Sequence, residues 1–330
     1  MSSSEDLPKV SFYDGRNSSE REEAASELRN LYTRYGDSPP SSAKEVSDVT
    51  GISRSDLEEW VSTIKAEKQV IFYGPPGTGK TFLAKHLSRM ICGQGGEWDL
   101  VQFHPAYSYE DFMQGLRPET TEEGALSYRM KPGRFLDFCE TAEETDSPCV
   151  LIIDEINRAN LSKVFGELMY LLEYREEEIP LAAGEREGEK KKFSIPENVH
   201  IIGTMNTADR SIALVDFALR RRFAFIPLFA DDDFLEEVIE RYHDRVGTGF
   251  PTSALVEELQ NVNETIGEKS HAIGPSYFLR EDLGERIEEV WKYEIVPYLE
   301  EYFFSQPEEI DQFRWENVKD RILPNQDQDE

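Results

Sequence analysis

The chain has 330 residues, enough for one large or two ordinary domains. Its 36 lysines and arginines stand against 66 aspartates and glutamates, which gives a formal charge of -30. Such a surface repels DNA phosphates, so we do not expect this chain to be the main duplex-binding subunit of an assembly. The acidic excess is spread along the chain, which we interpret as a halophilic adaptation to a salt-rich cytoplasm. An acidic cytosolic protein kept soluble by its charge is the alternative.

Cysteine usage and hydropathy predict a cytoplasmic protein with no membrane partner. Cys92, Cys139 and Cys149 lie in or near apolar runs without metal-ligand spacing, so we interpret them as reduced packing residues. The five histidines do not cluster, and no zinc site is expected. No apolar run approaches the length of a membrane span, and the polar start is not typical of a signal peptide.

Breaks in composition predict the domain organisation. A weak helical spacing at residues 28–35 is followed by a Gly/Pro/Ser-rich linker at 36–42. We predict four segments: a polar and helical N-terminal segment with its linker (1–50), an α/β nucleotide-binding domain (51–230), an all-α lid (231–322) and an acidic tail (323–330).

A helix is predicted directly before the first strand. Ser55 and Glu58 have the spacing of a capping box. One apolar stripe follows at helical spacing, formed by Leu57, Trp60, Val61 and Ile64.

The central motif is a phosphate-binding loop between a strand and a helix. The apolar run 70–73 precedes it, a helical pattern begins at 82, and the loop itself reads Gly74-Pro75-Pro76-Gly77-Thr78-Gly79-Lys80-Thr81. The glycines let backbone N–H groups face phosphates at a helix N-terminus. Lys80 would reach the outer phosphates, and the Thr81 hydroxyl would bind Mg²⁺. A plain turn would need neither the Lys-Thr pair nor glycines at these offsets.

A second chemical landmark is the buried strand 149–153, which ends in Asp154 and Glu155. Because carboxyl ends of parallel strands carry site residues, we expect Asp154 to hold Mg²⁺ through water and Glu155 to polarise the attacking water. A buried strand that merely ends in solvated acids is the alternative.

The segments around this strand carry less chemical information. A strand is expected at 100–103, a structured insertion at 104–133 and a short helix near 135–139. After the acids, one helix is expected to bury Leu161, Phe165, Leu168 and Leu172. Segments 179–181 and 193–195 are expected to form a hairpin, whose lysines 190–192 are either a solvated turn or a surface that faces a pore or a partner.

A third buried strand, 199–205, ends at Asn206. One interpretation makes Asp209 a guanine-reading residue, but Thr207 and Ala208 replace the expected Lys-x pair. The favoured interpretation makes Asn206 a polar sensor beside the γ-phosphate and the attacking water, since an amide at a strand end can position water.

Asp216 precedes a helix that ends in Arg220, Arg221 and Arg222, followed by the strand 224–228. The arginines either compensate the helix C-terminus or include an arginine finger for a neighbouring subunit's nucleotide. We favour the finger. Beyond residue 230, three apolar stripes at helical spacing predict a helical lid, with a loop at 272–278 and an interruption at Pro297.

Together these motifs resemble McrB, the AAA+ motor family of McrBC modification-dependent restriction systems. The resemblance covers about residues 60 to 310, and its most specific element is the run Met205-Asn206-Thr207-Ala208-Asp209-Arg210-Ser211. It implies a P-loop AAA+ α/β domain with a central parallel sheet flanked by helices, followed by a small all-α lid.

The resemblance also implies function. McrB-like motors hydrolyse GTP, assemble as hexameric rings and are stimulated by a McrC-like partner that carries the nuclease. Carried over by motif, Asn206 is the sensor, Asp216 supports the region of the catalytic water, and Arg221, with Arg222 as second choice, acts in trans. The family usually has an amino-terminal DNA-recognition domain, whereas about 65 mostly polar residues stand here. Methyl-base recognition is therefore expected in another polypeptide.

Two rival functions remain open at this stage. The same fold would suit an ATP-using MoxR-like remodelling chaperone. A nucleotide-gated assembly platform with negligible hydrolysis is the third possibility, and Glu155, Asn206 and Arg221 argue against it.

Overall fold

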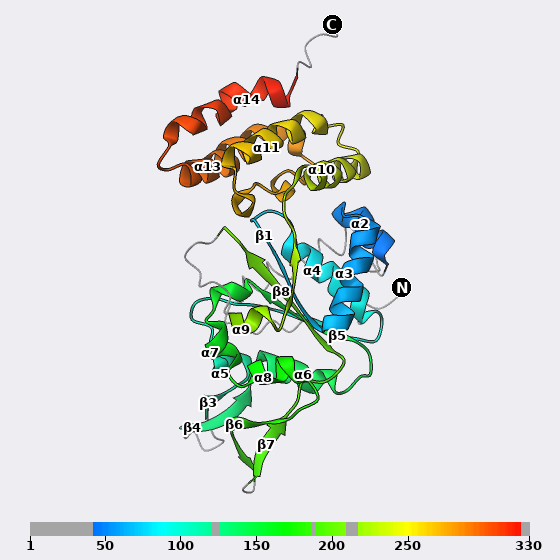
Figure 1. The fold of residues 1–330 in the computed structure, drawn as a ribbon, viewed down its shortest axis with the longest axis vertical. Helices are drawn as coiled ribbons and strands as arrows, with labels where there is room; N and C mark the ends of the chain where they lie inside the picture. The colour runs from blue at the N-terminus through cyan, green and yellow to red at the C-terminus, as the bar shows by residue number, and fades with distance from the viewer. Residues whose placement is uncertain (1–41, 121–125, 187–188, 209–216, 325–330) are drawn as a thin grey trace.

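The computed structural model describes residues 42–120, 126–186, 189–208 and 217–324. A sheet-centred domain carries a helical lid at one end (Figure 1). Predictions for residues 1–41, Asp209, Asp216 and the tail 325–330 lie outside the described residues. Within these residues, no helix is long and apolar enough to cross a membrane.

Five parallel strands form the central sheet in the order β2-β5-β8-β1-β9. The strands are β1 Gln69–Gly74, β2 Trp98–Gln102, β5 Cys149–Asp154, β8 Val199–Asn206 and β9 Ala224–Pro227. Each predicted strand of the nucleotide-binding domain is confirmed. Because all five run the same way, their carboxyl ends meet at one edge, where the phosphate loop, Asp154 and Asn206 follow.

Alternate residues of the inner strands serve two separate cores, as the two-residue period of a strand requires. Val70, Ile152 and Ile202 pack toward α2 Ala43–Thr50, α3 Arg54–Glu67 and α4 Lys80–Cys92. Ile71 and Ile153 instead pack toward the opposite helices, which are α5 Tyr109–Phe112, α6 Arg134–Ala142, α7 Leu161–Phe165, α8 Leu168–Glu173 and α9 Phe217–Arg220. The three cysteines are buried and free in these cores, as predicted.

Two local predictions are wrong. Helix α3 is capped by Ser53, whose hydroxyl accepts the Asp56 N–H, and not by Ser55 with Glu58. Glu58 instead pairs with Arg54 one turn away. The single helix expected over 161–172 is two helices, because Gly166 adopts a left-handed conformation with φ 51°. Its four predicted core residues are nevertheless buried.

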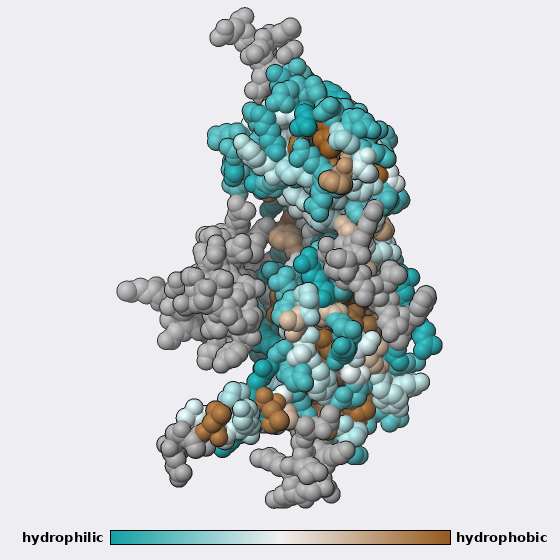
Figure 2. All heavy atoms as spheres, turned by 90° about the vertical axis from the view of Figure 1, so that its left-hand side faces the viewer, coloured by the Kyte–Doolittle hydropathy of each residue, from teal (hydrophilic) through white to brown (hydrophobic). Residues whose placement is uncertain are grey.

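Two hairpins extend the sheet domain away from the lid (Figure 1). The insertion contains β3 Gln114–Thr120 paired with β4 Leu126–Pro132, and the predicted second hairpin consists of β6 Ile179–Arg186 and β7 Glu189–Phe193. Leu116, Leu126 and Tyr128 of the first hairpin are exposed. Figure 2 shows apolar surface on an arm at this end, whereas the lid surface is mainly hydrophilic.

The lid is helical, as predicted, with its own apolar core around the buried Trp291. Its helices are α10 Asp232–Val246, α11 Thr252–Ile266, α12 Leu283–Val290, a π-helix Trp291–Ile295, α13 Val296–Tyr302 and α14 Trp315–Ile322, with 3₁₀ turns at Lys269–His271, Pro275–Tyr277 and Pro307–Phe313. The interruption expected at Pro297 is wrong: a π-helical turn precedes it and the helical path continues through it.

Candidate functional site: the nucleotide-binding edge of the sheet

The phosphate loop has the backbone shape that its glycines permit. Gly77 and Gly79 have φ 80° and 82°, in the left-handed region that side chains other than glycine seldom adopt. A side chain at Gly74 would collide with the Leu228 carbonyl of the neighbouring strand segment. Helix α4 begins at Lys80, so the loop ends on a helix N-terminus, where backbone N–H groups can bind phosphate.

Lys80 is buried within this loop, and its ammonium donates to the Pro75 carbonyl at 2.6 Å. The Thr78 hydroxyl donates to the same carbonyl at 3.1 Å. Burial lowers the pKa of Lys80 to about 8, although the carboxylates of Glu155 and Asp154 oppose the shift. Burial thus disfavours the charged form of Lys80, and the negative charge of an incoming phosphate would stabilise it.

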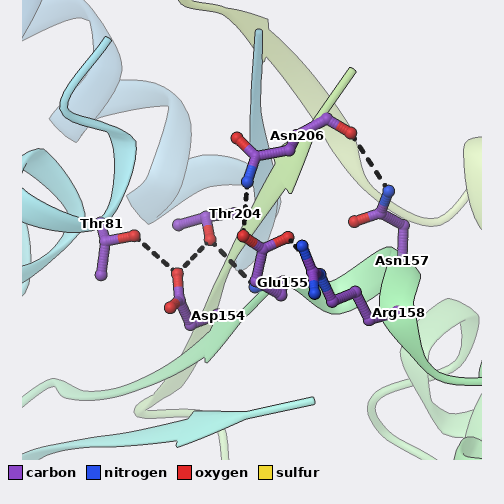
Figure 3. Close-up of polar contacts among 7 residues, drawn as sticks. All are labelled: Thr81, Asp154, Glu155, Asn157, Arg158, Thr204 and Asn206. Atoms are coloured by element: carbon purple, nitrogen blue, oxygen red, sulfur yellow. Dashed lines mark hydrogen bonds and ion pairs between the residues drawn. The ribbon is translucent and has the colours of Figure 1, made fainter. Parts of the chain in front are cut away.

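Asp154 lies at the carboxyl end of β5 and accepts two hydroxyl hydrogens on one oxygen (Figure 3). Thr81 Oγ1 donates to Oδ1 at 2.6 Å, and Thr204 Oγ1 donates to the same atom at 2.5 Å. Hydroxyl and carboxylate oxygens fit Mg²⁺, which takes its remaining ligands from phosphate and water. In the described ranges, no group of three or more His, Cys, Asp and Glu side chains could hold an ion alone.

Glu155 is held at its backbone and at both carboxylate oxygens. Its φ is 52°, unusual for a residue other than glycine, and its N–H donates to Thr204 Oγ1 at 3.2 Å. Asn206 Nδ2 donates to Oε1, and Arg158 Nε contacts Oε2 at 3.3 Å. The predicted amide sensor, Asn206, and the acid predicted to polarise water, Glu155, are therefore in direct contact, as Figure 3 shows.

Asn206 connects these acids to the phosphate loop. In the parallel register it lies opposite Gly74, and the next residue, Thr207, donates its N–H to the Gly74 carbonyl at 3.0 Å. Asn157 Nδ2 donates to the Asn206 carbonyl at 3.2 Å. The strand end that carries the predicted sensor is thus held by hydrogen bonds on both sides.

The three arginines have different surroundings. Arg220 lies over the Phe225 ring, and Arg222 pairs with Glu173 at 2.5 Å with only 14 % of its side chain exposed. Arg221 is exposed, and none of the described residues forms an ion pair with it. Arg221 is consequently the arginine most available to a neighbouring molecule. Asp216, predicted to support the region of the catalytic water, lies outside the described residues.

Two family models match the chain over these elements. Residues 69–223 match an AAA domain of the dynein-related subfamily, and residues 254–311 match the McrB alpha-helical lid domain. The chain is 41 % identical over 287 residues to the type IV methyl-directed restriction enzyme EcoKMcrB subunit of Escherichia coli, covering 81 % of this chain and 60 % of that protein. The chain is a McrB-like AAA domain protein.

Other relatives are more distant. The type II restriction enzyme BsuMI component YdiS of Bacillus subtilis is 29 % identical, over 53 % of this McrB-like chain and 59 % of its own length. Among solved structures, the Thermotoga maritima RuvB Holliday junction branch migration motor is similar at 16 % identity with a TM-score of 0.39, over 85 % of this chain and 89 % of that one. The chain spans about 60 % of the length of the two curated relatives.

The McrB-like lid rests directly on the phosphate loop. Ser276 N–H donates to the Gly77 carbonyl at 3.0 Å, and a side chain at Gly274 would collide with the backbone of Gly77. Thr207 Oγ1 donates to the Ser270 carbonyl at 3.1 Å. Lid segment 270–276 therefore contacts both the loop expected to bind phosphate and the residue after the sensor.

Sequence reasoning missed Thr204, Asn157 and Arg158 as site residues. Thr204 carried a usable signal, because it is a hydroxyl in an otherwise apolar buried strand, two residues before Asn206 and hence on the same face. Arg158 follows Glu155 by three residues, a spacing at which helical side chains meet. The contact of Asn157 with Asn206 joins two strands' ends and had no local signal.

Proposed function

We propose that this chain is a Mg²⁺-dependent nucleoside triphosphatase that uses GTP and drives a McrBC-like, methyl-directed restriction system. The observation that carries the proposal is the contact of Thr81 and Asp154 beside a Glu155 that Asn206 holds. These groups have the placement needed to bind a metal–phosphate unit and to orient a water for in-line attack.

Each group has a defined task in this proposal. Lys80 and the loop N–H groups bind the outer phosphates, and Thr81 and Asp154 hold Mg²⁺, which neutralises charge on the phosphate oxygens. Glu155 accepts a proton from the attacking water, and Asn206 orients that water and the carboxylate. Electrostatic stabilisation and positioning carry the catalysis.

We further propose a homo-oligomeric ring, hexameric as in the family, in the cytoplasm. Arg221 of one subunit then reaches the nucleotide of the next, with Arg222 as second choice. A McrC-like nuclease subunit is the expected partner, and DNA is reached through the ring or that partner. The match to the McrB lid supports this function over an ATP-using MoxR-like chaperone.

Glu155→Gln tests the catalytic assignment. The amide is isosteric but is a far weaker base, so turnover should fall by about 100-fold or more while nucleotide affinity stays within a few-fold. Phosphate release and equilibrium binding are measured with GTP and with ATP, with and without a candidate nuclease subunit. Glu58→Gln, on the exposed face of α3, is the control. Wild-type turnover in Glu155→Gln would refute the role, and a preference for ATP would favour the chaperone.

A further inference from the structure

The Thr204 hydroxyl joins the expected metal site to the expected catalytic base. Thr204 lies near the end of β8 and is 2 % exposed. Its oxygen accepts the Glu155 N–H at 3.2 Å and donates its hydrogen to Asp154 Oδ1 at 2.5 Å. Thr81 Oγ1 donates to that same Oδ1 at 2.6 Å, which completes a chain of four residues (Figure 3).

The direction of each bond follows from the chemistry of the groups. A hydroxyl carries one hydrogen and two lone pairs, so Thr204 can donate once and still accept from a backbone N–H. Thr81 likewise keeps its hydrogen on Asp154 while a lone pair remains available for a cation. Valine has the shape of threonine but can do neither, so a Val at 204 would leave the Glu155 N–H without this acceptor.

The backbone of Glu155 makes this acceptor important. Its φ of 52° lies in the left-handed region, which residues other than glycine rarely occupy and which persists only where the surroundings impose it. The bond to Thr204 and the bond from Arg158 N–H to the Glu155 carbonyl at 2.9 Å impose it here. This conformation directs the carboxylate toward Asn206.

We propose that Thr204 is a positioning residue that sets the Asp154 carboxylate for Mg²⁺ and the Glu155 backbone for water activation with a single hydroxyl. The proposal rests on the proposed triphosphatase function. It predicts that loss of the hydroxyl lowers both kcat and the apparent affinity for Mg²⁺, because both acids share this one group.

The experiment compares three variants of the full chain: Thr204→Val, Thr204→Ser and Thr50→Val. Thr50 is the matched control because it is also buried, donates to the Val46 carbonyl at 2.8 Å and accepts the Ile52 N–H at 3.2 Å. It lies at the end of α2, outside the bonds that join Thr81, Asp154, Thr204 and Glu155. The readouts are kcat and KM at saturating Mg²⁺, and the apparent Mg²⁺ affinity measured by binding of a fluorescent, non-hydrolysable GTP analogue. Thermal melting is recorded for each variant.

In Thr204→Val, kcat should fall about 10- to 100-fold with KM within about threefold, and the apparent Mg²⁺ affinity should fall several-fold. Thr204→Ser should restore both values to within about threefold of wild type, and Thr50→Val should change neither. The proposal is overturned if Thr204→Val matches wild type, if Thr204→Ser is as impaired as Thr204→Val, or if Thr50→Val loses as much.

The two proposals can fail separately. If the wild-type chain hydrolyses no nucleotide under any condition, the proposed function fails. The Mg²⁺ affinity of Thr204→Val then still decides the positioning role, because that measurement requires binding alone. An unchanged Mg²⁺ affinity in that case overturns the role of Thr204 as well.

Discussion

When a nucleotide binds above pH 8, the Lys80 side chain should take up a proton. Burial lowers the pKa of this ammonium from 10.5 to about 8, and the nearby Asp154 and Glu155 carboxylates only partly offset the desolvation. A bound triphosphate places several negative charges beside Lys80, which favours its charged form. Affinity is therefore fully present below about pH 8 and is lost as the pH rises through that value, because the neutral amine must first be protonated.

The size of the effect follows from the pKa. At pH 7 about nine in ten Lys80 side chains carry the charge, and at pH 9 about one in eleven do, so the apparent Kd should rise about tenfold between these values. This corresponds to about 1.4 kcal/mol. A lysine with its ordinary pKa of 10.5 would give almost no change over the same range.

The assay is a fluorescence titration of a GTP analogue at constant free Mg²⁺ from pH 7 to pH 9. Calorimetry at pH 8.5 in two buffers of different ionisation enthalpy counts the protons taken up. Lys80→Arg is the control, because a guanidinium stays charged throughout and its affinity should be flat with pH, whatever its absolute value. A flat wild-type profile with no proton uptake would refute the perturbed lysine.

Three other outcomes are expected. Gly274→Ala should weaken nucleotide affinity about tenfold, because its Cβ would collide with the Gly77 backbone and lift the lid. Gly284→Ala should bind as wild type, because Gly284 is exposed and its added Cβ would make only an ordinary contact with the Phe250 ring at 3.9 Å. Mixing equal amounts of Arg221→Ala and Glu155→Gln, each inactive alone, should restore about a quarter of wild-type turnover if the arginine acts in trans, because about one site in four then combines an intact Glu155 with an intact neighbouring Arg221. No recovery of turnover would contradict the ring. Raising KCl from 0.1 to 2 M should raise Tm by several degrees, because salt screens the repulsion between acidic side chains in a chain of charge -30. An unchanged or lower Tm would contradict adaptation to a salt-rich cytoplasm.

The parts of the site that sequence reasoning found are those with local signals. The run 149–153 is continuously apolar because both faces of β5 are buried, and its two terminal acids mark the carboxyl edge of a parallel sheet. The glycine spacing of the phosphate loop reflects left-handed backbone at Gly77 and Gly79. In these segments the neighbours along the chain determine the conformation, so the pattern was sufficient for the fold class and the site edge.

The parts that it missed depend on contacts between distant segments. The Glu173 carboxylate that holds Arg222 is 49 residues away along the chain, and nothing near either residue indicates the pair. The register between β5 and β8 decides that Thr204 meets Asp154. At Gly166, helical periodicity continued across a break that the glycine conformation caused, so a pattern of buried residues was correct while the single helix was wrong.

The end of β8 connects the lid to Asp154 and Glu155 through three residues within positions 204–207. Thr204 contacts Asp154 and Glu155, Asn206 contacts Glu155, and Thr207 contacts the lid carbonyl of Ser270. Displacing the lid therefore pulls on the residue beside the sensor, and Gly274→Ala should lower kcat as well as affinity. Lys80→Arg changes a group expected to bind the phosphates, and Lys80 donates within the loop to the Pro75 carbonyl and the Thr78 hydroxyl. The activity that this variant loses should therefore appear mainly as a higher KM. If both variants changed KM alone, this strand end would not transmit lid position to the acids.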